Sequence, residues 1–207
     1  MKTGLIVLAV IVVIALIVGG IFIGPRNQMA IKREAVNSAF AQVDVVLQRR
    51  SDLIPNLVAT VKGFAQHEEA VFSEIANARS AYLNAKTPTE KIAANNQLDA
   101  SLAKVLVLTE NYPQLKSNEN FLRLQDELAG TENRIAVERR RYNEVVQDYN
   151  TFIATFPNSL IASIAGFTRN DAYFKTEPGA RTAPKVDFTP TPAPSTPATP
   201  APAPAKP

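Results

Sequence analysis

A run of uncharged, mostly aliphatic residues from Leu5 to Ile23 constrains this chain more than any other feature of its sequence. As an α-helix the run extends about 28 Å, which is close to the hydrocarbon thickness of a bilayer. A cleaved signal peptide has a shorter apolar core that ends at small residues, whereas this run stays apolar to its last residue. The sequence therefore predicts an uncleaved, single-pass transmembrane anchor over residues 5–24, which contacts the lipid bilayer and follows a cap at residues 1–4.

The next part of the chain has the pattern of a helical bundle. Between residues 28 and 156, apolar residues recur every three or four positions, which is the spacing of a buried helix face. We expect an all-α fold, in which the N-terminal transmembrane helix is followed by an antiparallel up-down four-helix bundle with short loops. The expected helices cover residues 28–53, 56–85, 88–112 and 118–154.

Pro55 separates the first two expected helices. A proline removes a backbone N–H and disfavours helix at the residue before it. The apolar phase from Val46 through Leu57 to Val61 continues across the proline, as it would in one kinked helix. Chain length favours a turn instead, because a single helix over residues 28–85 would extend about 87 Å with too little chain to cover it. We therefore predict a turn at Pro55.

Two later helices have start signals. Thr87 is followed three residues later by Glu90, which is the spacing of a capping box. Ser117 or Asn118 caps the last helix of the bundle. After it, residues 157–188 form a short amphipathic segment and a C-terminal extension, which either caps the base of the bundle or lies in the lipid interface; we predict capping. Residues 189–207 are rich in Pro, Ala and Thr, so we expect a disordered tail.

Composition excludes several kinds of site. The chain has no cysteine and one histidine, which rules out disulfides and zinc-thiolate sites and leaves too few ligands for a di-iron carboxylate bundle. Residues 26–156 carry 16 Lys/Arg and 16 Asp/Glu, so the body is neutral. The triplet at residues 139–141 points in three directions around a helix and forms no basic face. We expect no catalytic activity, no cofactor or metal, and no nucleic-acid partner.

Two carboxylates fall on apolar stripes. Glu68 lies on the stripe of the second expected helix, and Glu138 lies on that of the last. A buried carboxylate needs a partner or a raised pKa, and helix lengths place Arg134 near the level of Glu68. Glu68 either forms a structural ion pair or lies at the edge of the stripe, or else it is part of a polar pocket inside the bundle. Glu138 lies about 10 Å lower, so we predict no catalytic pair.

Three separated motifs carry a family resemblance. The first runs from Arg49 to Val58 and continues to His67 and Glu68; the others are residues 111–128 and 156–167. They resemble the LemA family of bacterial proteins. The resemblance implies an N-terminal membrane anchor and a four-helix bundle, with a poorly defined biochemical activity. The family motifs and polar core positions together mark these candidate interaction residues: Arg49, Arg50, Asp52, Pro55, Asn56, His67, Glu68, Arg134 and Glu138.

These features predict a membrane-anchored envelope protein that acts as a scaffold or adaptor, through self-association or a protein partner. The alternative is a binding module with a small-molecule or peptide pocket between the helices near His67, Glu68 and Arg134. Two arguments oppose each other on the side of the membrane. One extra positive charge after the anchor favours a cytoplasmic body. The resemblance includes proteins in which a lipobox replaces the anchor, which favours the outside. We predict a single-pass inner-membrane protein with a periplasmic or external body.

Overall fold

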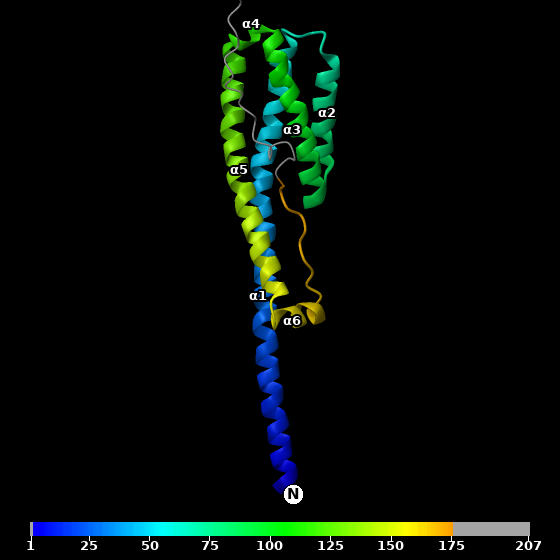
Figure 1. Ribbon diagram of the computed structural model, residues 1–207, viewed down its shortest axis with the longest axis vertical. Coiled ribbons are helices and arrows are strands. Elements are labelled where there is room, and N and C mark those ends of the chain that lie inside the picture. Colours follow the sequence, from blue (N-terminus) through cyan, green and yellow to red (C-terminus); the bar gives the residue numbers. More distant parts are fainter. Residues whose placement is uncertain (1, 176–207) are drawn as a thin grey trace, which may run out of the picture. The chain divides into compact units, whose positions relative to one another are not determined.

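The computed structural model describes residues 2–175, without the side chains at positions 2, 15, 18 and 21. Residues up to Phe174 form one compact unit. Its regular structure is entirely helical across the described residues. The helices are α1 (Lys2–Lys62), α2 (Glu69–Asn84), α3 (Pro88–Asn111), α4 (Pro113–Lys116), α5 (Glu119–Ala154) and α6 (Asn158–Ala165) (Figure 1). Residues 176–188 of the expected C-terminal extension and the expected disordered tail at residues 189–207 lie outside the described residues.

The predicted turn at Pro55 is wrong, because α1 continues through both Pro25 and Pro55 to Lys62. The alternative of one helix over residues 28–85 is correct only in that the helix continues across Pro55, since α1 ends at Lys62. The apolar residues that continue across the proline, Ile54, Leu57 and Val61, are buried. The chain reverses over residues 63–68 instead, so the second helix begins at Glu69 and not at residue 56.

A contact from another helix satisfies the carbonyl that Pro55 leaves without its helical donor. Pro55 has no N–H to donate to the carbonyl of Ser51, four residues earlier in α1. Arg79 Nε of α2 donates to that carbonyl at 2.9 Å. Because the freed acceptor has a partner, the proline remains inside the helix without leaving a buried carbonyl unpaired.

The first part of α1 carries many apolar side chains that no described residue covers. Leu5, Leu16 and Ile17 are 70%, 71% and 56% exposed, and their apolar neighbours are similarly exposed. Across the described residues, with the side chains named above left out, no helix is both long and apolar enough to cross a membrane.

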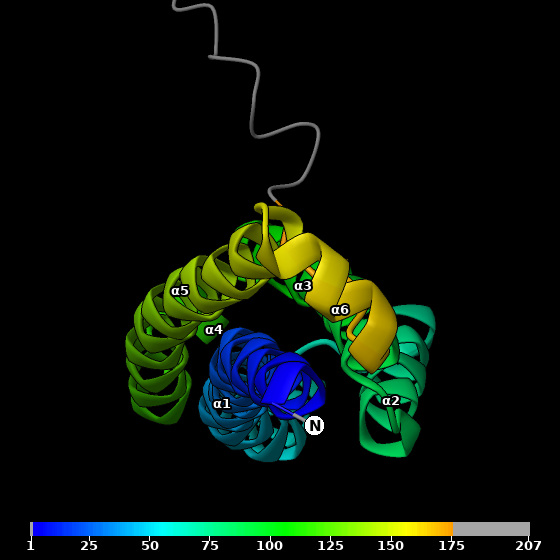
Figure 2. The same ribbon diagram turned by 90° about the horizontal axis from the view of Figure 1, so that it is seen from below.

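The long helices α1, α2, α3 and α5 alternate in direction (Figure 1). Seen from below, α5, α3 and α2 form an arc around α1 (Figure 2). One buried apolar cluster lies beside the α1–α2 reversal and includes Ile54, Ile75 and Phe121. A second cluster joins the lower parts of α1 and α5 to α6, and includes Val43 and Tyr142.

The predicted start signals of α3 and α5 are confirmed. Thr87 Oγ1 accepts the N–H of Glu90, and a carboxylate oxygen of Glu90 accepts the N–H of Thr87, which closes the capping box. The backbone N–H groups of Lys86 and Thr87 both donate to the Glu90 carboxylate, and they lower the pKa of Glu90. Asn118 caps α5 by accepting the N–H of Phe121 at 3.0 Å.

Thr87→Ala should lower the free energy of unfolding by about 1 kcal/mol, because the N–H of Glu90 loses its acceptor. Thermal unfolding followed by circular dichroism measures the change. Thr89→Ala, in the same turn, leaves the box intact and is the matched control. Equal effects of the two substitutions would contradict a role for the cap.

Candidate functional site

A polar cluster lies inside the bundle and is centred on Arg50 of α1. Arg50 is 3% exposed and its neighbour Ser51 is fully buried. The apolar line of α1 brings Arg50 inward, because Val46 and Ile54 lie four residues before and after it on the same helix face. The side chain therefore enters the interior at the level where α1 faces α3 and α5.

Three side chains surround the guanidinium of Arg50. Arg50 Nη1 lies 2.8 Å from Glu132 Oε2 of α5 and also pairs with Asp99 of α3. Arg50 Nη2 donates to Asn95 Oδ1, and Asn95 is fully buried. We call Arg50, Asn95, Asp99, Glu132 and Arg139 the Arg50 cluster, since Arg139 Nη2 of α5 donates to Asp99 Oδ2 at 3.2 Å.

The charges of the Arg50 cluster balance, with two guanidinium groups and two carboxylates. Burying a charge is costly unless it is paired, and Arg50 has two carboxylate partners. Asp99 and Glu132 keep 26% and 50% of their side-chain surface exposed, so water still reaches the anions. The cluster therefore ties α1, α3 and α5 together through the two terminal nitrogens of the Arg50 guanidinium, whereas Arg50 Nε has no hydrogen-bond partner among the described residues. It contains no hydroxyl or thiol nucleophile beside a base.

A second polar group lies six residues earlier on α1. Tyr82 OH of α2 donates to Asp44 Oδ1 at 2.9 Å, and Lys91 of α3 pairs with the other oxygen of Asp44. Burial raises the pKa of the Tyr82 hydroxyl, and the bond to Asp44 raises it further. The Asp44 group thus joins α1 to α2 and α3, whereas the Arg50 cluster joins α1 to α3 and α5.

The structure brings Arg50 into a site but leaves most of the other predicted residues apart. Four predicted residues on α1 and two beyond it have exposed side chains: Arg49, Asp52, Pro55, Asn56, His67 and Arg134. Asp52 accepts a hydrogen bond from Gln48 at 2.9 Å. Glu138 is half-buried, and its Oε2 has no hydrogen-bond partner among the described residues.

The predicted partnership of Glu68 with Arg134 is wrong. Glu68 lies at the start of α2 and accepts a hydrogen bond from Tyr112 OH at 3.2 Å. Burial raises the pKa of Tyr112, and the Glu68 carboxylate contributes in the same direction. Arg134 lies two residues after Glu132 and so near the level of Arg50. The end of α1 lies about 18 Å above that level, so His67, Glu68 and Arg134 do not line one pocket.

Sequence reasoning missed most of the Arg50 cluster. The sequence indicated no role for Asn95, Asp99, Glu132 or Arg79, and it marked Arg139 only as part of the triplet at residues 139–141. One usable signal was the position of Arg50 itself, on a line of apolar residues where a charge requires a partner. A second was the pair Asn95 and Asp99, four residues apart and flanking the buried Leu98.

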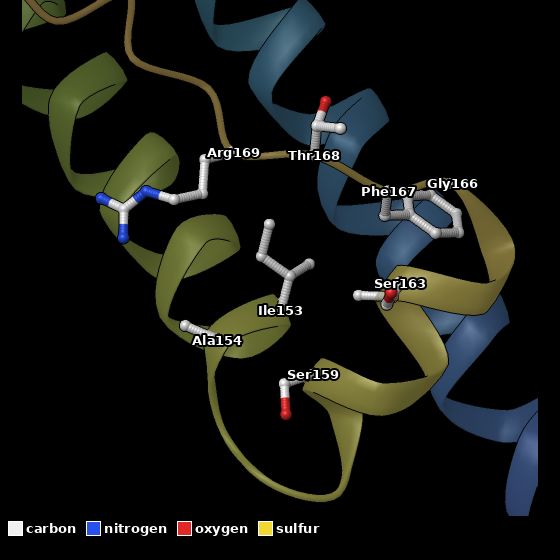
Figure 3. Close-up of a pocket in the computed structure, with 9 residues that line it drawn as sticks. Ile153, Ala154, Ser159, Ser163, Gly166, Phe167, Thr168 and Arg169 are labelled. Carbon is white, nitrogen blue, oxygen red and sulfur yellow. The ribbon is translucent and has the colours of Figure 1, made fainter.

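The described residues also contain a cavity of about 450 Å³ beside α6 (Figure 3). Its walls come from the end of α5, from α6 and from the segment that follows: Ile153, Ala154, Ser159, Ala162, Ser163, Gly166, Phe167, Thr168 and Arg169. Arg169 Nε lies 3.8 Å from Asp171, and the Thr168 carbonyl accepts from Tyr149 OH at 2.8 Å. In residues 2–175, no group of three or more His, Asp or Glu side chains is placed to hold a metal ion.

Comparisons with known proteins assign the chain to a family. A model described as the LemA family matches residues 39–188, which include the Arg50 cluster and α6. Magnetosome protein MamQ 2 of Paramagnetospirillum magneticum is 24% identical over 182 residues, with 75% of this chain and 66% of the relative covered. Protein LemA of Metamycoplasma hominis is 23% identical over 143 residues, with 69% and 65% covered. This chain thus spans slightly less than two thirds of each relative. The chain belongs to the LemA family.

Proposed function

We propose that this protein is a membrane-anchored helical scaffold of the cell envelope, which acts by holding other protein surfaces at a fixed place above the bilayer. The observation that carries the proposal is the continuity of α1. One helix runs from the exposed apolar side chains near Leu5 to the buried Arg50 cluster. A body joined to its anchor in this way has no flexible linker between them.

The exposed apolar surface of α1 supports the anchor. From Leu5 to Ile17, every large apolar side chain that the structure describes is about half exposed or more, and no described part of the chain packs on it. Insertion of residues 5–23 into hydrocarbon would remove this surface from water. We place the body on the periplasmic or external side.

The character of the site supports a scaffold without catalytic activity. The Arg50 cluster and the Asp44 group join helices to one another, and their charges are already paired. One of the two relatives described above, magnetosome protein MamQ 2, is named for a subcellular structure and not for a reaction. Apolar side chains also remain exposed on the body, including Val45, Leu106, Val107 and Val137, and these are available to protein partners.

A labelling experiment tests the anchor and its orientation. The chain has no cysteine, so Thr3→Cys and Ala76→Cys each provide a single thiol on an exposed residue, one on each side of the apolar run. In intact spheroplasts, a membrane-impermeant maleimide should label Ala76→Cys at once and Thr3→Cys only after lysis.

The opposite labelling pattern would place the body in the cytoplasm and contradict the predicted side. Labelling of both thiols before lysis would contradict the anchor itself. The scaffold role is tested by sedimentation of the full chain in detergent, where we expect association to increase with protein concentration. A monomer at every concentration, together with saturable thermal stabilisation by a small ligand, would instead favour a binding module.

A further inference from the structure

The short helix α6 has two apolar faces, and only one of them is covered by protein. Ile161 and Ala162 are 6% and 4% exposed and belong to the cluster that joins α1 and α5. Leu160 and Ile164, four residues apart, are 62% and 70% exposed. Phe156, in the turn between α5 and α6, is 83% exposed. The predicted capping therefore describes the inner face of α6 and leaves the outer face unexplained.

The position of α6 indicates what covers the outer face. Phe22, at the end of the apolar run of α1, packs against the same cluster as Ile161. Met29, seven residues further along α1, is fully buried in that cluster. α6 also lies crosswise to α1 at the base of the bundle (Figure 1). If residues 5–23 lie in a bilayer, α6 must lie at its surface, because no linker separates the two.

The charges near α6 fit a lipid surface. Residues 156–168 contain no charged side chain, so insertion of this segment dehydrates no ion. Cations lie around it on neighbouring segments. Arg26 and Arg169 are exposed, and the guanidinium of Arg33 lies 5.2 Å from the centre of the Phe167 ring. Interfacial helices usually carry such cations on their own polar face, and here α1 and the segment after α6 supply them.

We infer that α6 is a second membrane contact, in which Phe156, Leu160 and Ile164 insert among the outer acyl segments of a phospholipid bilayer. The inference rests on the proposed anchor and extends it. α1 fixes the chain in the bilayer, and α6 fixes the bundle against the surface. The arginines near α6 contact anionic headgroups.

Single-cysteine variants test this contact in the full chain reconstituted into liposomes of phosphatidylethanolamine and phosphatidylglycerol. A polarity-sensitive fluorophore is attached at Leu160→Cys or Ile164→Cys, and the lipids carry a nitroxide quencher near the headgroup end of the acyl chain. Ile14→Cys reports the anchor. Val137→Cys, on an exposed apolar residue of α5, is the matched control on the body.

We expect a blue shift and strong quenching at Leu160→Cys and Ile164→Cys, and water-like emission without quenching at Val137→Cys. Burial of the label at Ile14→Cys alone would overturn the α6 contact and leave the anchor standing. Water-like emission at all four positions would overturn the anchor and the α6 contact together. Equal quenching at Val137→Cys would also overturn the inference, because lipid would then touch the body without regard to α6.

Discussion

Arg50→Ala should lower the free energy of unfolding by about 3 kcal/mol, because it removes the one cation that Glu132 and Asp99 share inside the bundle. This loss lies at the low end of the range for removing one partner of a buried ion pair. Both carboxylates keep some access to water, and Asp99 keeps its ion pair with Arg139. In a unit of this size the midpoint of thermal unfolding should fall by about 10 °C. Circular dichroism of the full chain in detergent measures it.

Arg49→Ala is the matched control, because Arg49 is the neighbouring residue of the same type and is exposed. Its effect should stay within about 0.5 kcal/mol. Arg50→Lys keeps the charge but loses the planar fork that reaches Asn95, Asp99 and Glu132 together, so it should be intermediate. If Arg50→Ala does not fold, Arg50→Lys still distinguishes the two positions. Equal losses of stability after Arg49→Ala and Arg50→Ala would contradict a stabilising role for the Arg50 cluster.

Arg79→Met should lower the free energy of unfolding by about 2 kcal/mol in the natural chain, and by much less in a chain that also carries Pro55→Ala. In the natural chain, the buried carbonyl of Ser51 has Arg79 as its donor, and loss of that donor leaves the carbonyl unpaired. An alanine at position 55 restores the helical N–H four residues after Ser51, so the carbonyl keeps a partner when Arg79 is removed. The two substitutions should therefore be coupled by about 1–2 kcal/mol.

Denaturant unfolding of the four variants in the cycle measures this coupling. Pro55→Ala alone should stabilise the chain by about 2 kcal/mol, because proline is the least favourable residue inside a helix. Arg134→Met, on an exposed arginine of α5, should change little in either background. Additive effects of Pro55→Ala and Arg79→Met would show that Arg79 does not compensate for the proline.

Capping residues in the sequence correctly predicted where α3 and α5 begin. The capping box at Thr87 and the cap at Asn118 act within one helical turn, so their residues are adjacent in the sequence. Pro55 shows the opposite case. Taken locally, a proline favours the end of a helix. The contact that offsets this preference comes from Arg79, which is 24 residues later in the chain and on another helix.

The error at Pro55 also explains the error at Glu68. A turn at residue 55 would have placed Glu68 about 20 Å along the second helix, near the level of Arg134. The reversal at residues 63–68 leaves Glu68 at the end of the bundle, beside Tyr112. The burial of Arg50 could be predicted from the sequence, because Arg50 falls on the apolar face of its helix. Its partners Asn95 and Glu132 were not, because they depend on the relative register of α3 and α5.

Because α1 is unbroken, the rotation of residues 5–23, the proposed anchor, about the helix axis is fixed relative to the bundle. Each residue of an α-helix turns the chain by about 100°, so the side of α1 that faces α5 determines which side of residues 5–23 faces away from it. If the helix of another membrane protein bound one side of residues 5–23, that protein would therefore face one particular side of the bundle. One residue inserted into α1 between residues 5–23 and the bundle would rotate that side of the bundle by about 100°, which is more than a quarter of a circle.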